Sequence, residues 1–186
     1  VFMSSRDGVR FKRWTEAFIR PGLQPERWVN RNNMTAWGLV ETAPELPGTP
    51  PVFSLYSTEN YYSESAVRLR RLVTRLDGFV SVQAPMSGGS FITKPFTFSA
   101  PVGQAPVTLR LNASTSAVGG IRGEIQSADD GRPLPGFAAD DCDILFGDGI
   151  DLAMHWRGGD LRPWSGKPIQ LRLELQDADV FAYRFA

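Results

Sequence analysis

The densest group of ionisable side chains in the sequence is a run of aspartates in ADDCDILFGDGID, residues 139–151. Calcium binds six to eight oxygen atoms, which carboxylates, backbone carbonyls and water can supply. One hypothesis is therefore a structural calcium ion, with the candidate ligands Asp141, Asp143, Asp148 and Asp151. The order of residues does not fit an EF-hand loop, which has a glycine and a closing glutamate at fixed positions. The alternative hypothesis is that these aspartates cap turns and pair with arginines of the other part of the chain, residues 1–76.

Aromatic side chains are the second group that could bind a ligand. A sugar ring stacks its C–H face on an exposed aromatic ring, while polar groups nearby bind its hydroxyls. The candidate carbohydrate-binding residues are Trp28, Tyr61, Tyr62 and Trp164, and burial in a core or an interface is the alternative for each of them. For Trp37 and Trp156 we expect packing in the core or burial in an interface.

The single histidine and the single cysteine limit the catalytic chemistry. A Ser-His-Asp triad would have to use His155, and the sequence has no G-x-S-x-G motif around a nucleophilic serine. We expect His155 to be partly buried with one hydrogen-bonded ring nitrogen. Cys142 has no partner for an intramolecular disulfide, and the neighbouring aspartates disfavour a thiolate. We therefore expect a buried, unreactive thiol.

The elements that would position these residues are β-strands. Apolar residues alternate with polar ones in residues 121–125 and 169–176, which is the pattern of a strand with one buried face. Turn sequences such as DDGRPLPG, RGGD and SGKP separate short strands, expected at 107–114, 119–126, 151–156, 169–176 and 181–186. The sequence predicts an all-β protein, with an antiparallel, jelly-roll-like β-sandwich over residues 77–186.

Residues 1–76 are expected to form a smaller set of additional β-strands. They begin with a hairpin over residues 1–14, in which the Asp7-Gly8 pair marks the turn. They carry eleven Lys and Arg against seven Asp and Glu, a net charge of +4, whereas residues 77–186 carry nine against thirteen, a net charge of −4. This change in charge supports a boundary near Asp77.

The overall composition excludes two classes of partner. The formal net charge of the 186 residues is zero, so the chain lacks the positive charge that sequence-independent nucleic-acid binding requires. No run of residues approaches the roughly 18 consecutive apolar residues that span a bilayer. We therefore expect neither a nucleic acid nor a membrane as a partner.

Several segments carry a family resemblance, among them AWGLVET, SLYSTENYY, GGSFITKPFTF, LRLNASTSAVGGIRGEIQ, HWRGGDL and GKPIQLRLELQDADVFAYRF. The chain resembles the C-terminal region of bacterial glycoside hydrolase family 32/43-like proteins, in which a β-propeller precedes a β-sandwich. The resemblance implies that residues 1–76 correspond to the last strands of the propeller and residues 77–186 to the sandwich. It also implies a secreted or periplasmic location.

From this resemblance we expect a non-catalytic, carbohydrate-binding or accessory module of a glycoside hydrolase-like protein. Its partners would be an oligo- or polysaccharide and the rest of the parent polypeptide. One alternative is a purely structural domain that supports the propeller. Another is a glycosidase, which requires a pair of carboxylates at a fixed separation, such as Glu59 and Asp143. Exposed aromatic rings on one patch would favour the binding module over the supporting domain.

Overall fold

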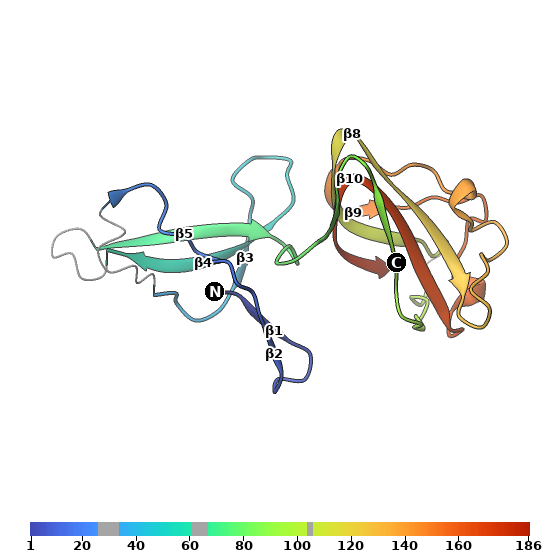
Figure 1. The fold of residues 1–186 in the computed structure, drawn as a ribbon, viewed down its shortest axis with the longest axis horizontal. Coiled ribbons are helices and arrows are strands. Elements are labelled where there is room, and N and C mark those ends of the chain that lie inside the picture. The colour runs from blue at the N-terminus through green and yellow to red at the C-terminus, as the bar shows by residue number, and fades with distance from the viewer. Residues whose placement is uncertain (26–33, 61–66, 104–105) are drawn as a thin grey trace. The chain divides into compact units, whose positions relative to one another are not determined.

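The computed structural model describes residues 1–25, 34–60, 67–103 and 106–186. The chain folds into two compact units. We call residues 1–43 and 52–74 the first unit, and residues 44–51 and 75–186 the second unit. In the described residues, regular structure consists of antiparallel strands and short 3₁₀ helices (Figure 1). The predicted all-β, antiparallel, sandwich-like fold with additional N-terminal strands is confirmed.

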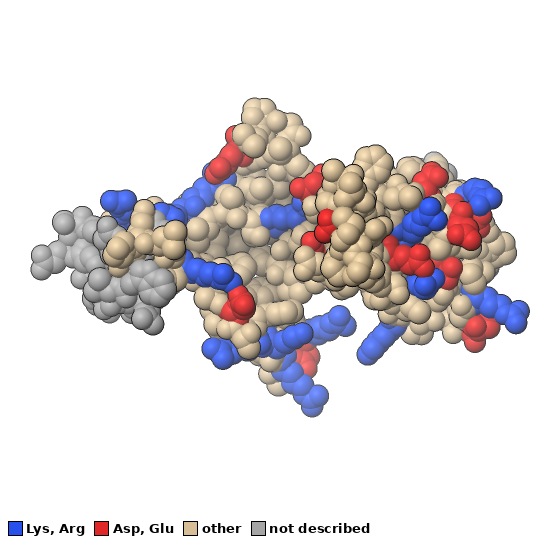
Figure 2. Space-filling model, turned by 45° about the horizontal axis from the view of Figure 1, so that its top comes forward, with Lys and Arg blue, Asp and Glu red and all other residues tan. Residues whose placement is uncertain are grey.

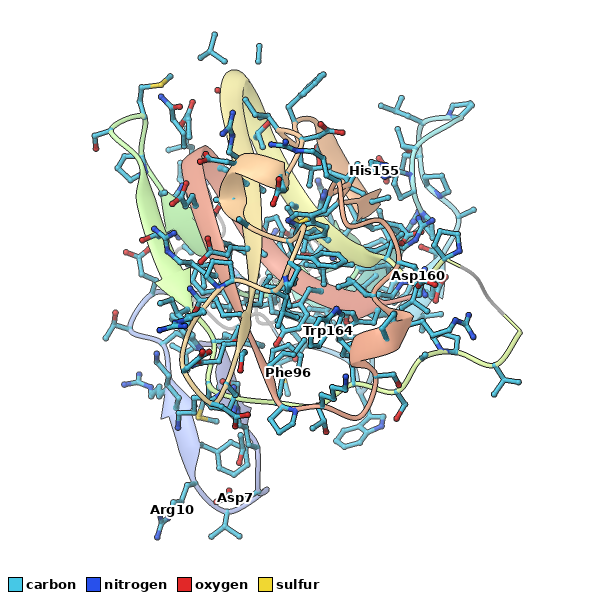
Figure 3. All side chains as sticks on the ribbon, turned by 90° about the vertical axis from the view of Figure 1, so that its right-hand side faces the viewer. Asp7, Arg10, Phe96, His155, Asp160 and Trp164 are labelled. Atoms are coloured by element: carbon cyan, nitrogen blue, oxygen red, sulfur yellow. The ribbon has the colours of Figure 1, made fainter. Side chains whose placement is uncertain are left out.

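The first unit contains a hairpin and a three-stranded sheet. The hairpin pairs β1 (Met3–Ser5) with β2 (Phe11–Arg13). At its tip, Asp7 Oδ1 accepts hydrogen bonds from the backbone N–H groups of Val9 (2.9 Å) and Arg10 (2.7 Å). Figure 3 labels Asp7 and Arg10 at this tip. The carboxylate therefore holds the turn, and the predicted hairpin is present.

The three-stranded sheet of the first unit has the order β3-β4-β5, with β3 at Val40–Thr42, β4 at Val52–Glu59 and β5 at Arg68–Arg75. Its interior is polar. Arg71 donates hydrogen bonds to Ser54 Oγ (2.8 Å) and Thr42 Oγ1 (3.0 Å), so one guanidinium links all three strands. The buried residues described in this unit are Ser54, Ser57 and Glu59, whereas Leu69, Val40 and Val73 are exposed.

The second unit is built on one five-stranded antiparallel sheet. Four of its strands have the order β6-β10-β8-β9. The fifth strand, β7, also pairs with β10, but along a different stretch of β10 than β6 does. The strands are β6 (Val82–Ala84), β7 (Gly89–Ile92), β8 (Leu109–Ser127), β9 (Asp148–Ala153) and β10 (Ile169–Phe185). The pairing of β8 with β10 runs from Ile169 opposite Ser127 to Phe185 opposite Leu109. These two strands therefore hold the unit together.

The long strands correct one expectation from the sequence. Residues 107–114 and 119–126 were expected as separate strands, but they belong to one strand, β8, and residues 169–176 and 181–186 likewise belong to β10. The strands continue through irregular points, such as the register shift between Gln176 and Ala178. There a Cβ on Gly119 would lie 2.5 Å from the carbonyl oxygen of Asp177, so the glycine permits the close approach of the backbones.

The hydrophobic core lies in the second unit. The sheet contributes fully buried residues from alternate positions of its long strands: Leu109, Leu111, Ala113, Ile121, Ile125, Leu171 and Leu173. The segments around β9 cover them with Leu134, Phe137, Cys142, Met154, Trp156 and Leu161. These segments also contain the 3₁₀ helices η2 (Ala139–Asp141) and η3 (Arg162–Trp164).

Gly123 and Trp156 show how tightly this core is packed. The indole Nε1 of Trp156 donates a hydrogen bond of 2.8 Å to the carbonyl oxygen of Gly123. A Cβ on Gly123 would lie 2.7 Å from Trp156 Cζ2 and 2.8 Å from Met154 Cε. The absence of a side chain at Gly123 therefore makes room for the tryptophan, and the predicted burial of Trp156 in the core is found.

Candidate functional site

The two long strands present a polar surface on the side away from the core. The buried apolar side chains of β8 are at odd-numbered positions, so its even-numbered side chains point the other way, and their direct partners on β10 lie on the same face. The outward cross-strand pairs are Gln126 with Gln170, Glu124 with Arg172, Arg122 with Glu174, and Arg110 with Arg184. We call this surface the polar face.

A cleft of about 590 Å³ opens on the polar face where β7, β8 and β10 are neighbours. We call it the Arg122 cleft, and its polar lining includes Ser90, Arg122, Arg172, Glu174 and Gln176. Three lining residues, Gly88, Gly89 and Gly120, have no side chain and leave backbone accessible. Ile144 is an exposed apolar residue at the cleft. The lining therefore offers guanidinium, carboxylate, amide and hydroxyl groups within one concave surface.

The charges in this cleft are only partly paired. Arg172 Nη2 lies 2.7 Å from Glu174 Oε1, which joins two neighbouring outward positions of β10. Arg122 forms an ion pair with Asp140 at 4.0 Å, and the Asp140 side chain is 97% exposed. Such an exposed ion pair is weak and screened by salt, so a ligand could replace it at little cost. Acidic and basic side chains lie next to one another on the part of the second unit that Figure 2 shows.

A second carboxylate of the polar face, Glu124, is buried beneath the segment that follows Phe137. Its Oε1 accepts a hydrogen bond from Gln126 Nε2 (2.6 Å), and its Oε2 accepts one from the backbone N–H of Ala139 (3.3 Å). Glu124 therefore fixes the start of η2 at the sheet, and it does not line the cleft.

The aspartates predicted as calcium ligands are engaged by arginines. Asp141 Oδ1 lies 2.9 Å from Arg157 Nε, and Asp148 Oδ1 lies 2.5 Å from Arg75 Nη1. Asp151 pairs with both Arg110 and Arg184, each at 2.9 Å. Asp143 is exposed. Of these arginines, Arg75 comes from residues 1–76, so a pair with the other part of the chain, as the alternative hypothesis expects, is present for Asp148. Asp141 and Asp151 pair with arginines of residues 77–186 instead.

The residues outside the undescribed ranges 26–33, 61–66 and 104–105 contain no group of three or more His, Cys, Asp or Glu arranged to hold a metal ion. Calcium binding by the four aspartates stays a prediction. The carboxylates proposed for a glycosidase lie in different units. Glu59 is in the first unit, where it pairs with Arg70 at 2.9 Å, and Asp143 is in the second unit.

Trp164, the predicted aromatic residue that the structure describes, does not line the Arg122 cleft. Trp164 follows Asp160 closely along the chain (Figure 3), is half-buried against the core, and has the Lys167 ammonium 4.6 Å from its ring centroid. Trp28, Tyr61 and Tyr62 lie outside the described residues. Trp37 is fully exposed, so it does not pack in a core, and its burial in an interface stays a prediction. The proposed role of these rings in sugar binding stays a prediction.

His155 and Cys142 lie on neighbouring segments, since the backbone N–H of Asp143 donates a hydrogen bond to the carbonyl oxygen of His155 (2.9 Å). The side chain of His155 is exposed, which corrects the expected partial burial (Figure 3). Cys142 is buried as expected. Burial raises the pKa of its thiol to about 11, and Asp143 adds to the effect, against the lowering by the Gly123 N–H and Arg122. Cys142 is therefore protonated at neutral pH and is not a nucleophile there.

The residues that line the Arg122 cleft were not singled out from the sequence. Their signal was present in the polar positions of IRGEIQ and IQLRLELQ, which alternate with the apolar ones. An alternating polar set is also what any solvent-facing sheet surface shows, so the sequence could not distinguish a cleft from an ordinary exposed face.

The chain matches no family model, no curated protein and no solved structure. The resemblance to glycoside hydrolase family 32/43-like proteins therefore stays a prediction. No helix in the described part of the chain is long and apolar enough to cross a membrane.

Proposed function

We propose that the second unit is a non-catalytic module that binds carbohydrate in the Arg122 cleft. The observation that carries the proposal is the cleft of about 590 Å³ lined by both hydrogen-bond donors and acceptors on rigid strands. Its volume is in the range typical of small-molecule sites, about 300–1,000 Å³.

The lining suits a ligand rich in hydroxyl groups. Each sugar hydroxyl donates and accepts a hydrogen bond, whereas a guanidinium only donates and a carboxylate only accepts. Arg122 and Arg172 can each bind two oxygens at once, and Glu174 offers acceptors beside them. Ile144 supplies an apolar contact for the C–H groups of the ring. Because the cleft lacks a large apolar surface, we expect specificity from hydrogen bonds and modest affinity.

The supporting role remains the second candidate, and the first unit favours it. A sheet is stable when it buries an apolar face against another layer. The described residues of the first unit bury only polar side chains and expose Leu69, Val73 and Val40. We infer that this unit gains stability by packing against the rest of a parent polypeptide, as the resemblance implies. This role does not exclude sugar binding by the second unit.

The test is binding of the whole chain to a panel of plant, algal and host polysaccharides, followed by titration with the oligosaccharides of any class that is retained. We expect retention on one class, and loss of affinity in the variants Arg122→Ala and Glu174→Gln. Arg132→Ala is the matched control, because Arg132 is an exposed arginine of the same unit outside the cleft. Retention that is unchanged in both cleft variants, or no retention by a folded chain, would refute the proposal.

A further inference from the structure

A second cleft lies further along β8 and β10. It has a volume of about 360 Å³, and its lining includes Asp77, Arg110, Asp151, Tyr183 and Arg184. We call it the Arg184 cleft. An adjoining depression of about 500 Å³ shares Arg110, Asp151 and Arg184 with it. Strands β8 and β10, which line the Arg122 cleft, therefore also line a second hollowed surface near the C-terminal end of β10, made of the Arg184 cleft and the adjoining depression.

Both clefts open on the polar face. Arg110 and Arg122 are even-numbered residues of β8, whose odd-numbered residues Leu109, Leu111, Ile121 and Ile125 are fully buried. Arg184 is the direct cross-strand partner of Arg110, as Glu174 is of Arg122. Directly paired residues of antiparallel strands project to the same side of a sheet. The register therefore places arginines and carboxylates of both clefts on one surface.

The spacing of the two clefts suits a chain molecule. Glu174 and Arg184 are ten residues apart on β10, which corresponds to at most about 33 Å along a strand. The bulges of β10 shorten and bend this path. An extended oligosaccharide of several sugar rings is long enough to follow this path.

The Arg184 cleft has groups that could contact such a chain. Asp151 accepts from both Arg110 and Arg184, but the Arg184 side chain is 64% exposed, so its guanidinium remains accessible. Tyr183 is the direct cross-strand partner of the fully buried Leu111, and its ring centroid lies 5.8 Å from that of Phe96, so its ring projects from the core side of the sheet and not from the polar face. The groups that face a ligand here are the guanidinium of Arg184 and the carboxylate of Asp151, which can donate to and accept from sugar hydroxyls.

We propose that the Arg184 cleft is a second subsite for the same polysaccharide, so that one extended chain contacts both clefts. This inference rests on the proposed function of the Arg122 cleft. Two linked contacts raise the affinity for a ligand that reaches both, because binding at the first holds the ligand near the second. A ligand that reaches only one cleft does not gain this advantage.

The experiment measures the affinity of the whole chain for short and long oligosaccharides of the retained polysaccharide by titration calorimetry. In the wild type we expect the long oligosaccharides to bind about threefold to tenfold more tightly than the short ones, the gain from one or two added contacts. Arg184→Ala should bring this ratio toward one. Arg122→Ala should weaken binding of both lengths, and Arg132→Ala should change neither.

Each outcome separates the two proposals. If long and short oligosaccharides bind equally, or if Arg184→Ala leaves the ratio unchanged while Arg122→Ala weakens binding, the second subsite is refuted and the Arg122 cleft stands. If Arg122→Ala has no effect on either length, the proposed function fails. Circular dichroism and urea midpoints identify any variant that is misfolded, and Arg184→Gln is the decisive variant if Arg184→Ala is unstable.

Discussion

Arg75 is expected to be the side chain on which the stability of the second unit depends most. It is the first residue of the long segment of that unit, and it donates hydrogen bonds to four acceptors. These are Asn112 Oδ1 (2.6 Å), Asp148 Oδ1 (2.5 Å), the carbonyl oxygen of Ala113 (2.8 Å) and that of Gly149 (2.9 Å). The guanidinium therefore joins β8 to β9 at a point where the strands carry a register shift.

The expected cost of Arg75→Ala follows from these contacts. A hydrogen bond to a charged group contributes about 1.5–3 kcal/mol, and an acceptor left buried without a donor adds a penalty. The four bonds share one side chain and are not additive, and the burial of the charge, whose side chain is 20% exposed, offsets part of the gain. We therefore expect the free energy of unfolding to fall by about 2–4 kcal/mol. Arg75→Lys keeps the charge but cannot reach four acceptors, so it should lie in between.

The assay is urea unfolding of the whole chain, followed by the near-ultraviolet circular dichroism and fluorescence of the tryptophans. Trp156 is buried in the core of the second unit and reports on its unfolding. Arg68→Ala is the control, because Arg68 lies on the same strand, β5, but is exposed. If Arg75→Ala and Arg68→Ala unfold within about 0.5 kcal/mol of each other, the reasoning from the hydrogen bonds is wrong.

Four further predictions concern the second unit. Gly123→Ala should lower the free energy of unfolding by about 1–3 kcal/mol in the same assay, because a Cβ would overlap Trp156. An unchanged urea midpoint would show that the neighbouring core side chains move to make room for it. Cys142 should react with iodoacetamide far more slowly in the native chain than in urea near pH 9, because burial raises the pKa of its thiol to about 11, and equal rates would contradict this burial. For the same reason, the free energy of unfolding should fall as pH rises from about 9 to 11. The pKa of Asp160 is lowered because its carboxylate accepts hydrogen bonds from backbone N–H groups. The stability that this carboxylate contributes is present above pH 3.8 and should be lost as the pH falls below it, so acid should lower the melting temperature of Asp160→Asn less than that of the wild type. Arginines pair with Asp141, Asp148 and Asp151, so the melting temperature in calcium should be no higher than in a chelator. A clearly higher melting temperature in calcium would support the calcium hypothesis.

Local patterns in the sequence were enough to predict the class of fold. The alternation in residues 121–125 and 169–176 predicted strands with one buried face, and Asp7-Gly8 predicted the hairpin turn. The continuity of β8 and β10 was missed because residues 115–118 and 177–180, where the register shifts, were not assigned to a strand. Only the partner strand shows that these residues form bulges, and such pairing is not encoded locally.

The candidate site was harder to predict from the sequence than the fold class, for a related reason. Arg122 and Glu174 are more than fifty residues apart in the chain, and only the register of β8 with β10 makes them cross-strand partners. Trp37 was expected in a core or an interface because aromatic residues usually bury large areas, but it is exposed in the structure and packs in no core. The aspartate pairs with Arg75, Arg157 and Arg184 likewise depend on the tertiary fold.

The position of β10 in the chain has a consequence for how the protein is made. This strand pairs with β6, β7 and β8, yet it follows all of them in sequence. During synthesis on the ribosome, the earlier strands must therefore wait without their common partner, with their apolar side chains and backbone edges unprotected. The sheet of the second unit assembles only after residues 169–185 have left the ribosome, which makes this unit a slow-folding one that is open to chaperone binding while it is being translated.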